Sequence, residues 1–500
     1  MFKNNPLYPV FFAVFSVIFL AANNISQIPI DATYRPLILY VLFGVVVYVL
    51  TQLFLKDWHR SALVASIFLF MFSAYGQIYL VVKNLMVGST RIIGHRTFLP
   101  MYIIVFAVIL YLVVRKVKRP VAYTFWLNFV FLSFLIQPMF NIIVGAYQQW
   151  IINHFTKVTP IQATINADQP DIYYIILDAY AREDVLLNKL GYDNSEFLDA
   201  LRQRGFYVAD CSQSNYAYTE YSLPSSLNYD YFDNLNATSQ FDRVLLLKHG
   251  AVRSFLESNA YKAVAFPTGW VFTEWVDADI YPDYSHPVTA LTEYETFLIN
   301  TTMLRSLNDF GLFNQVNSSF TAPRRLRVLS LLSNIKQLPK MDEKLFVFAH
   351  LVVPHPPYSF DANGKPANYN EESIADYQSM AIAYINQVEF VNKEILNVID
   401  VLLMDSEKQP IIIIQGDHGP PPELSLTYSE KMPILNAYYL PGKKMDTLLY
   451  PSISPVNTFR VVLNSYFGED LPLLDDKSYY ASEENHDQYK LVPNSCPEKQ

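Results

Sequence analysis

The sequence predicts an N-terminal multi-span α-helical membrane domain, followed by an α/β domain with a mostly parallel central sheet. Two observations support this prediction. Apolar runs of about 18–22 residues recur in the first third of the 500-residue chain, and such runs are long enough to cross a bilayer as helices. From about residue 168 the pattern changes to short apolar runs separated by longer mixed segments, as in parallel sheets covered by helices on both faces.

About five spans are predicted within a membrane domain over residues 1–147. They are Pro9–Ala22 with its flanks, Pro36–Leu55, Ser61–Val82, Pro100–Val114 and Phe125–Ala146. Each must be helical, because within lipid the chain has to satisfy its own backbone hydrogen bonds. The first run has few basic flanking residues and is followed by further spans, so it is interpreted as a span and not as a cleaved signal peptide.

The charged loops predict the orientation of these spans. Basic residues are dense in the loop 115–119 and less dense in the loop 56–60, and the positive-inside rule places both loops in the cytoplasm. The loop 83–100 also carries basic residues but is assigned to the outside, because the loop 115–119 is denser and closer to its helices. An odd number of spans then places a linker over 148–167 and the α/β domain over 168–500 outside the cytoplasm.

Charge and cysteine content exclude some classes of protein. The net charge of −9 lies almost wholly after the spans and includes no basic patch, so no nucleic-acid partner is expected. The two cysteines, Cys211 and Cys496, either form a disulfide in an oxidising compartment or remain unpaired thiols. No cluster of cysteine and histidine indicates a structural zinc site.

Five buried strands are predicted in the second domain, with the clearest helix over 374–403. The strands cover 171–177, 261–266, 345–353, 410–415 and 434–440. In open α/β sheets ligands bind beyond the carboxyl ends of the strands. Reactive side chains are therefore expected just after residues 177, 353 and 415.

Carboxylates and imidazoles lie at three of these strand ends. Asp178 follows the first strand, His350 and His355 lie at the end of the third, and Asp417 and His418 follow the fourth in an Asp-His-Gly sequence. A single aspartate after a strand is usually a turn or helix cap, but this combination predicts a site for one divalent metal ion. Carboxylate oxygens with imidazole nitrogen favour Zn²⁺ or Mn²⁺, with Mg²⁺ or Ca²⁺ as alternatives.

The order of these motifs resembles the alkaline-phosphatase/sulfatase superfamily, and within it the sulfatase-like branch. The likeness covers about residues 171–480: a strand with Asp, a hydroxyl-rich segment, His-Pro-Pro-Tyr, and a strand with Asp-His-Gly. Spans followed by such a domain are also the layout of lipoteichoic acid synthases and of phosphoethanolamine transferases acting on lipids. The resemblance implies that Asp178, Asp417 and His418 are metal ligands.

The resemblance also implies the nucleophile. Type I sulfatases carry Cys-x-Pro-Ser-Arg, whose cysteine becomes formylglycine, whereas the equivalent segment here places Thr219 at that position and Cys211 lies too early. Formylglycine chemistry is therefore not expected, and a threonine at this place is similar to the lipoteichoic acid synthases and phosphoethanolamine transferases. A threonine hydroxyl beside a metal ion loses its proton more readily and can attack phosphorus. In the alternative, Thr219 is a helix cap and Ser222 is the working hydroxyl.

The ligand set predicts one metal ion. Asp178, Thr219, Asp417 and His418 provide four ligands, and the first strand is followed by Asp-Ala where sulfatases have paired aspartates. The additional Asp-x-x-x-His group of two-metal relatives is missing.

Further residues have predicted roles around that ion. His355 is expected to hydrogen-bond the phosphoryl oxygens or to protonate the leaving oxygen, a role that a near-neutral pKa suits. His350 either binds substrate or belongs to the core, and Arg182 and Ser222 are candidates for substrate binding. For Arg182 an ion pair with Asp184 at a helix start is the alternative.

An insertion with two tryptophans is a candidate roof for the site. Trp270 and Trp275, near His286, offer rings that can stack on a sugar or cover a lipid, or they lie in ordinary aromatic-rich loops.

The sequence therefore predicts a membrane-anchored, metal-dependent phospho-transferase that uses Thr219 and acts on a membrane lipid or cell-envelope glycan headgroup. The first alternative is a phosphate- or sulfate-ester hydrolase with the same ligands. The second is a catalytically silent membrane binding module, although such a module has no need of the retained ligand set.

Overall fold

The computed structural model describes residues 5–83, 86–87, 90–91, 94–154, 169–282, 284, 291–310, 321–367, 369, 374, 376–425, 427–482 and 488–496. The chain divides into two compact units. Unit 1 comprises Met1–Trp150 and Thr289–Phe320, and unit 2 comprises Ile151–Val288 and Thr321–Gln500.

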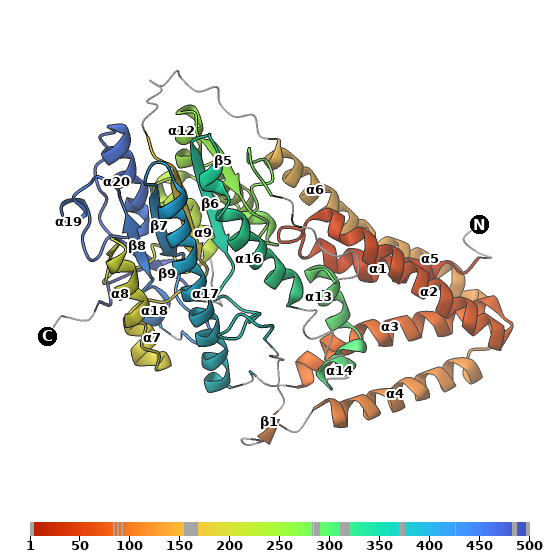
Figure 1. The fold of residues 1–500 in the computed structure, drawn as a ribbon. Coiled ribbons are helices and arrows are strands. Elements are labelled where there is room, and N and C mark those ends of the chain that lie inside the picture. The colour runs from red at the N-terminus through yellow and green to blue at the C-terminus, as the bar shows by residue number, and fades with distance from the viewer. Residues whose placement is uncertain are drawn as a thin grey trace. The chain divides into compact units, whose positions relative to one another are not determined.

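Unit 1 is a set of apolar helices (Figure 1). Its N-terminal elements are α1 (Tyr8–Ala22), η1 (Ile30–Thr33), α2 (Tyr34–Leu55), α3 (Trp58–Val82), the antiparallel pair β1 (Met86–Val87) and β2 (Thr90–Arg91), α4 (His95–Lys116), α5 (Val121–Phe134) and α6 (Ile136–Asn153). Among the described residues, 4 helical segments are long and apolar enough to cross a membrane: Ile30–Leu55, Trp58–Val82, His95–Lys116 and Val121–Asn153. The predicted span at α1 coincides with an apolar helix of only 15 residues, so a fifth span stays a prediction.

Two helices from the middle of the sequence belong to unit 1. They are α13 (Glu293–Thr301) and α14 (Leu304–Asp309). The hydroxyl of Tyr294 donates to a backbone carbonyl of α1 at 2.7 Å, and the carboxylate of Glu295 pairs with Arg35 at the start of α2. We predicted one domain over 168–500, but α13 and α14, which lie within that range, belong to the unit of the apolar helices. The sequence of a short amphipathic helix shows that one of its faces is buried, but it does not show which part of the chain covers that face.

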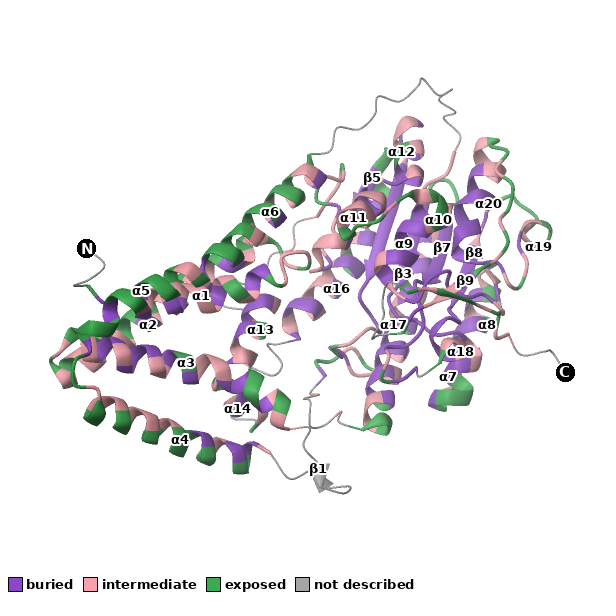
Figure 2. Cartoon of the chain, turned by 180° about the vertical axis from the view of Figure 1, so that it is seen from behind, coloured by how far each residue is buried: buried purple, intermediate pink, exposed green. Residues whose placement is uncertain are grey.

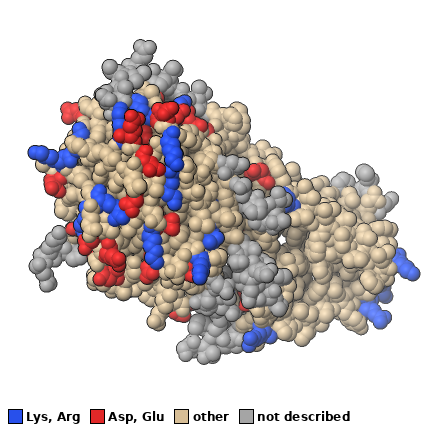
Figure 3. All heavy atoms as spheres, viewed as in Figure 1, with Lys and Arg blue, Asp and Glu red and all other residues tan. Residues whose placement is uncertain are grey.

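Charge distinguishes the two units. In Figure 3 acidic and basic side chains are interspersed over the face of unit 2, whereas the helices of unit 1 show mostly uncharged atoms. Large apolar side chains on these helices are exposed, including Phe54 at 84% and Trp126 at 64%. Helices of this length with exposed apolar surface are membrane-spanning helices.

Unit 2 is built on a six-stranded sheet with the order β4–β8–β7–β3–β6–β5 (Figure 1). The strands are β3 (Ile172–Leu177), β4 (Tyr207–Val208), β5 (Lys262–Ala265), β6 (Leu345–Leu351), β7 (Ile411–Gly416) and β8 (Asn436–Tyr439). β5, β6, β3 and β7 are parallel, while β8 is antiparallel to β7 and β4 is antiparallel to β8. The predicted mostly parallel sheet is confirmed. The predicted strand 434–440 is antiparallel because its connection from β7 carries only the four-residue helix α18 (Tyr428–Lys431), too short for a full crossover.

Helices cover both faces of this sheet. Along β3, Tyr173, Ile175 and Leu177 pack toward α7, α8, α16 and α17, while the alternate residues pack toward α9, α11, α12 and α20. The first layer consists of α7 (Glu183–Leu190), α8 (Ser195–Gln203), α16 (Ala322–Ile335) and α17 (Tyr377–Asp405), and the second of α9 (Thr219–Leu227), α11 (Gln240–Lys248), α12 (Ala251–Ser258) and α20 (Pro455–Phe467). Since β3 is covered on both sides, all of its residues are apolar or aromatic and buried (Figure 2). The predicted helix 374–403 is α17.

The remaining elements of unit 2 are short. They are α10 (Phe232–Leu235), η2 (Val271–Thr273), η3 (Leu338–Lys340), α19 (Met445–Leu448), and the antiparallel pair β9 (Ser478–Tyr480) and β10 (Lys490–Val492) near the C-terminus.

Candidate active site

Five polar side chains converge at the carboxyl edge of the sheet. Asp178 follows β3, His350 lies in β6, Asp417 and His418 follow β7, and Thr219 is the first residue of α9. Ligand atoms of Asp178, His350 and Asp417 all lie within 4.8 Å of one another. His418 Nε2 lies 3.7 Å from Asp178 Oδ1 and 3.6 Å from Asp417 Oδ2. The convergence follows from the order β7–β3–β6, which makes the three strand ends neighbours.

Several buried polar atoms in this cluster have no hydrogen-bond partner among the described residues. They are both carboxylate oxygens of Asp178 and both ring nitrogens of His350, although the two side chains approach to 3.4 Å. Burial raises the pKa of Asp178, but the nearby imidazoles outweigh burial and hold the pKa below its usual range, so the carboxylate is ionised. Each unsatisfied buried group costs about 1–3 kcal/mol, and such groups normally have an explanation such as an ion.

The donor set fits a divalent metal ion. Two carboxylates, two imidazoles and one hydroxyl match the ligands that Zn²⁺ and Mn²⁺ prefer. The four ligands predicted from the sequence lie together, and His350, which we assigned to substrate or core, lies among them as a fifth candidate.

The hydroxyl of Thr219 is held by this cluster. Oγ1 donates to Asp417 Oδ2 at 2.6 Å and lies 3.2 Å from His418 Nε2. Asp417 Oδ1 accepts from the backbone N–H groups of Ala179 at 3.0 Å and of His418 at 2.9 Å, which fixes the carboxylate with Oδ2 toward Thr219. The N-cap of α9 is Tyr218, so the alternative of Thr219 as a helix cap has no support.

His418 is oriented by its second ring nitrogen. Nδ1 lies 2.8 Å from the carbonyl oxygen of Gly419 and Nε2 lies 3.2 Å from Thr219 Oγ1, so Nε2 points into the cluster. Burial lowers the pKa of His418, and the ammonium of Lys431 also lowers it, while the carboxylate of Asp417 acts in the opposite direction.

Lys431 was missed by the sequence analysis. Its Nζ lies 3.1 Å from His418 Nδ1 and donates to the carbonyl of Pro420 at 3.0 Å. Only 4% of the residue is exposed. A single lysine in a polar loop gives no sequence signal of a role in the site. It lies beside His418 only because the folded chain places α18 next to the end of β7.

His355 lies beside the cluster. Its backbone N–H donates to the carbonyl of Asp178 at 3.1 Å, and its ring is 6.4 Å from that of His418. Nδ1 lies 2.6 Å from the Pro356 carbonyl, so Nδ1–H donates there and Nε2 remains an acceptor. Although part of the residue is exposed, the surrounding protein buries the ring enough to lower the pKa of His355 to about 4. The near-neutral pKa expected from the sequence is therefore wrong.

The two tryptophans of the insertion have different places. Trp270 packs edge-on against His355 at 5.1 Å between ring centroids, so it lies beside the cluster. Trp275 is fully buried and stacks on Phe348 at 4.5 Å, so it belongs to the core and is not a roof. His286 lies outside the described residues.

Two predicted substrate-binding residues are engaged with the protein itself. Arg182 pairs with Asp184 at 2.7 and 2.9 Å and donates to the Ser212 carbonyl at 3.0 Å. This is the ion pair at a helix start that the sequence left as the alternative. Ser222 Oγ donates to the backbone carbonyl of Asp417 at 2.6 Å, so it supports the loop that carries the ligands.

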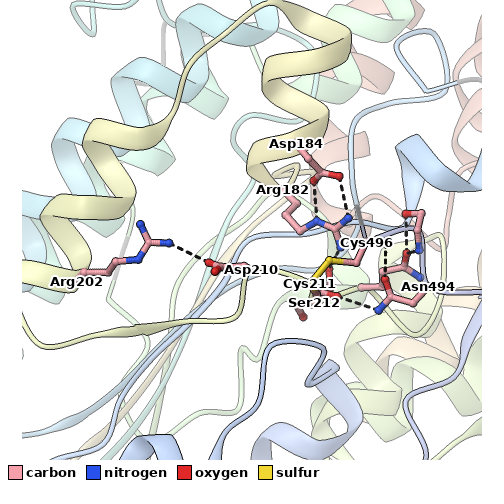
Figure 4. The surroundings of a disulfide bond; sticks show 10 residues. Arg182, Asp184, Arg202, Asp210, Cys211, Ser212, Asn494 and Cys496 are labelled. Atoms are coloured by element: carbon pink, nitrogen blue, oxygen red, sulfur yellow. Dashed lines mark hydrogen bonds and ion pairs between the residues drawn. A yellow bond between two sulfur atoms is a disulfide. The ribbon is translucent and has the colours of Figure 1, made fainter. Parts of the chain in front are cut away.

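A disulfide closes the same region. Cys211 and Cys496 are bonded across a sequence separation of 285 residues, and Figure 4 shows the bond beside the Arg182–Asp184 pair. Asn494 Nδ2 donates to the Cys211 carbonyl at 2.9 Å. The bond therefore ties the C-terminal segment to the loop that leads toward α9.

Two glycines allow the close backbone approaches behind the cluster. A Cβ on Gly416 would lie 2.5 Å from the carbonyl oxygen of Tyr180, and one on Gly419 would lie 2.6 Å from that of Lys431. Real Cβ atoms essentially never come this close. The Gly in the Asp-His-Gly sequence is thus required by packing against α18.

The family assignment follows from a comparison with known families. A model of the sulfatase family matches residues 170–449, more than half of the chain and the part that carries the cluster. The chain therefore belongs to the sulfatase family, within the alkaline-phosphatase/sulfatase superfamily, and is an enzyme of that class. No curated protein matches the chain.

Solved structures with a similar fold include transferases and sulfatases. The C-terminal periplasmic domain of EcEptC from Escherichia coli is 12% identical, with 66% of this chain and 94% of that chain covered and a TM-score of 0.43. The integral membrane protein lipooligosaccharide phosphoethanolamine transferase A from Neisseria meningitidis is 13% identical, with 93% and 96% covered and a TM-score of 0.39. BT1596, a 2-O GAG sulfatase, is 13% identical, with 61% and 72% covered and a TM-score of 0.37. These likenesses are too distant to assign an activity.

Proposed function

We propose that the chain is a membrane-anchored phospho-transferase that moves a phosphate-linked group from a lipid or glycan headgroup through Thr219. The observation that carries this proposal is the 2.6 Å hydrogen bond from Thr219 Oγ1 to Asp417 Oδ2, next to the unpaired atoms of Asp178 and His350. It supports the role of this hydroxyl, in the place where type I sulfatases carry cysteine, as the nucleophile beside a cation.

In the first half-reaction Thr219 Oγ1 attacks phosphorus. Its proton passes to Asp417 Oδ2, the phosphorus–oxygen bond of the leaving group breaks, and the departing oxygen takes up a proton from solvent. The product is a phosphodiester on Thr219. Asp178, His350, Asp417 and His418 would hold one divalent ion, with Zn²⁺ or Mn²⁺ favoured, and a bound ion supplies Lewis-acid stabilisation of charge on phosphoryl oxygen and on the threonine oxygen.

In the second half-reaction a hydroxyl of the acceptor attacks the phosphorylated threonine. His355 suits the role of base, because Nδ1–H donates to the Pro356 carbonyl and Nε2 is left as an acceptor. Thr219 leaves as the acceptor bond forms and recovers the proton from Asp417, and His355 then releases the acceptor's proton to solvent. We therefore replace the predicted acid role of His355 by this base role.

Three features support a site outside the cytoplasm. The chain carries membrane-spanning helices, the basic residues 115–119 lie where α4 ends and before α5 begins, and Cys211 and Cys496 form a disulfide, which persists in oxidising compartments.

The proposal is tested by trapping the intermediate. Purified protein is incubated with Mn²⁺ or Zn²⁺ and vesicles of phosphatidylethanolamine, and its intact mass and phosphorylated peptides are measured. Thr219→Ser should still form the adduct, and Thr219→Ala should form none. Full turnover by Thr219→Ala would show that the assigned nucleophile is wrong.

The family match also supports a second candidate, hydrolysis of phosphate or sulfate esters. The same ligands serve both reactions, and assays with aryl phosphodiesters and aryl sulfates separate them. Rapid sulfate release, without a threonine adduct, would favour the hydrolase. A silent binding module is disfavoured, since it would not need buried unpaired carboxylate and imidazole groups.

A further inference from the structure

A pocket outside the metal cluster lies on unit 2, lined by residues of α9, α10, α11 and β9 among others. Its volume is about 610 Å³, within the range of about 300–1,000 Å³ typical of small-molecule sites. Tyr221 of α9 lines it. Because Tyr221 and Thr219 are two positions apart on one helix, their side chains point to different sides of that helix.

One side of the pocket is aromatic. Tyr216 stacks on Tyr479 with 5.4 Å between ring centroids, and Tyr221 packs on Tyr489 at 4.7 Å. Tyr216 and Tyr221 are buried, while Tyr479, Tyr489 and Phe232 are half-buried. The half-buried rings offer apolar surface to a ligand, and the buried pair fixes them.

The other side of the pocket is polar. Arg243 lies over the Tyr221 ring at 4.4 Å and pairs with Glu220 at 3.2 Å. Three exposed side chains complete this side and offer hydrogen-bonding groups to a ligand, namely Asp233, Thr238 and Gln240.

The charges select the class of ligand. A cation is disfavoured, because the guanidinium of Arg243 already occupies the Tyr221 face. An anion is disfavoured by Glu220, which neutralises Arg243, and by the exposed carboxylate of Asp233 in the lining. A neutral ring with apolar C–H faces and hydroxyl groups at its edge satisfies both the aromatic and the polar side, as a sugar does.

We propose that this pocket binds a neutral sugar residue of the glycan acceptor, away from the residue that receives the phosphate-linked group. The sugar's place in the reaction rests on the proposed function, but its binding does not. An oligosaccharide held here would be anchored on one flank of α9 while another of its residues reaches Thr219. Such remote binding energy is a general means of orienting a substrate.

Direct binding measurements test this inference. The full-length protein is purified in a detergent without a sugar headgroup and titrated calorimetrically with mannotetraose, cellotetraose and chitotetraose. At least one of them should bind saturably. Arg243→Gln and Tyr479→Leu should each weaken binding about tenfold, because the first removes a charged hydrogen-bond donor and the second removes an aromatic face. Arg202→Gln is the matched control, because Arg202 also pairs with two carboxylates, both at 2.9 Å, and does not line the pocket.

The outcomes separate this inference from the proposed function. Absence of saturable binding by all three tetrasaccharides, or equal binding by the wild type and both pocket variants, overturns it. Binding of phosphatidylinositol vesicles and of none of the tetrasaccharides also overturns it, since the polyol would then be a lipid headgroup. Gln240→Ala, at an exposed position of the lining, replaces Arg243→Gln if that variant does not fold. Sugar binding that persists while no threonine adduct forms refutes the proposed function alone.

Discussion

Replacing His350 by phenylalanine tests whether this histidine is a metal ligand or a core residue. It is 2% exposed, both ring nitrogens lack hydrogen-bond partners, and it lies within 4.8 Å of Asp178 and Asp417 ligand atoms. Phenylalanine keeps the ring and removes both nitrogens. If His350 served only packing, this change would be nearly neutral or stabilising, because two unsatisfied polar atoms would be removed.

A ligand role predicts a large loss of metal affinity. Removing a residue that only supports a ligand typically costs 10–100-fold, so losing a ligand should cost about 100-fold or more. At a metal concentration of 100 times the wild-type Kd, the ion stabilises the wild type by about 2.7 kcal/mol. A 100-fold weaker variant would gain only about 0.4 kcal/mol from the same relation. At about 2–4 °C per kcal/mol, the wild-type midpoint should rise by about 5–11 °C and that of the variant by about 1–2 °C.

Thermal denaturation with and without Mn²⁺ or Zn²⁺, together with metal analysis after dialysis, measures both quantities. His249→Phe is the matched control, since His249 is a buried histidine bonded to the carbonyl of Ile152 at 2.7 Å and is outside the cluster. The reasoning is refuted if His350→Phe binds metal in the wild-type amount and keeps the wild-type shift.

Three further changes should affect stability. Gly416→Ala places a Cβ 2.5 Å from the Tyr180 carbonyl oxygen and should destabilise unit 2 by about 1–3 kcal/mol, measured by chemical denaturation. An unchanged denaturation midpoint would contradict this close contact between Gly416 and Tyr180. Burial raises the pKa of Asp171 from 3.8 to about 6, so its charge destabilises the fold fully above about pH 6 and not at all below about pH 3.8. Asp171→Asn should therefore stabilise the folded protein by about 2–3 kcal/mol at pH 8. A gain in stability that is equal at pH 8 and pH 4 would disprove burial of the charge as the cause. Cys496→Ser removes the bond to Cys211 and should cost about 2–4 kcal/mol, whereas a midpoint equal to that of the wild type under reducing and oxidising conditions would show that the bond does not stabilise the fold.

Much of the fold was predictable because its strands are buried on both faces. Runs such as 172–177 and 411–414 consist only of aliphatic and aromatic residues, which is typical of central parallel strands. The antiparallel direction of β8 was not predictable from its own residues, since a buried strand has the same composition in either direction. The direction of β8 depends on the length of the connection from β7, and the sequence did not show that the helix α18 in this connection is so short.

The metal ligands were predictable to the extent that they follow strands. Asp178, Asp417 and His418 lie directly after β3 and β7, where the sheet brings them together. His350 was ambiguous, because a histidine inside an apolar strand has the same pattern as a core residue, and the unpaired state of its nitrogens is a property of the fold alone. Lys431 reaches His418 only through the return of α18, which no local pattern shows.

The α13–α14 segment has a consequence for how the protein is made. Unit 1 is completed by Thr289–Phe320, and the ribosome synthesises Ile151–Val288 between its two parts, so the earlier helices wait for partners that emerge much later. A soluble version of unit 2 that began at residue 169 would carry this segment with Tyr294 and Leu298, 2% and 7% exposed in the whole protein, stripped of their cover. Exposed apolar surface of this kind promotes aggregation. Production of the catalytic unit alone therefore calls for replacing residues 289–320 with a short polar linker.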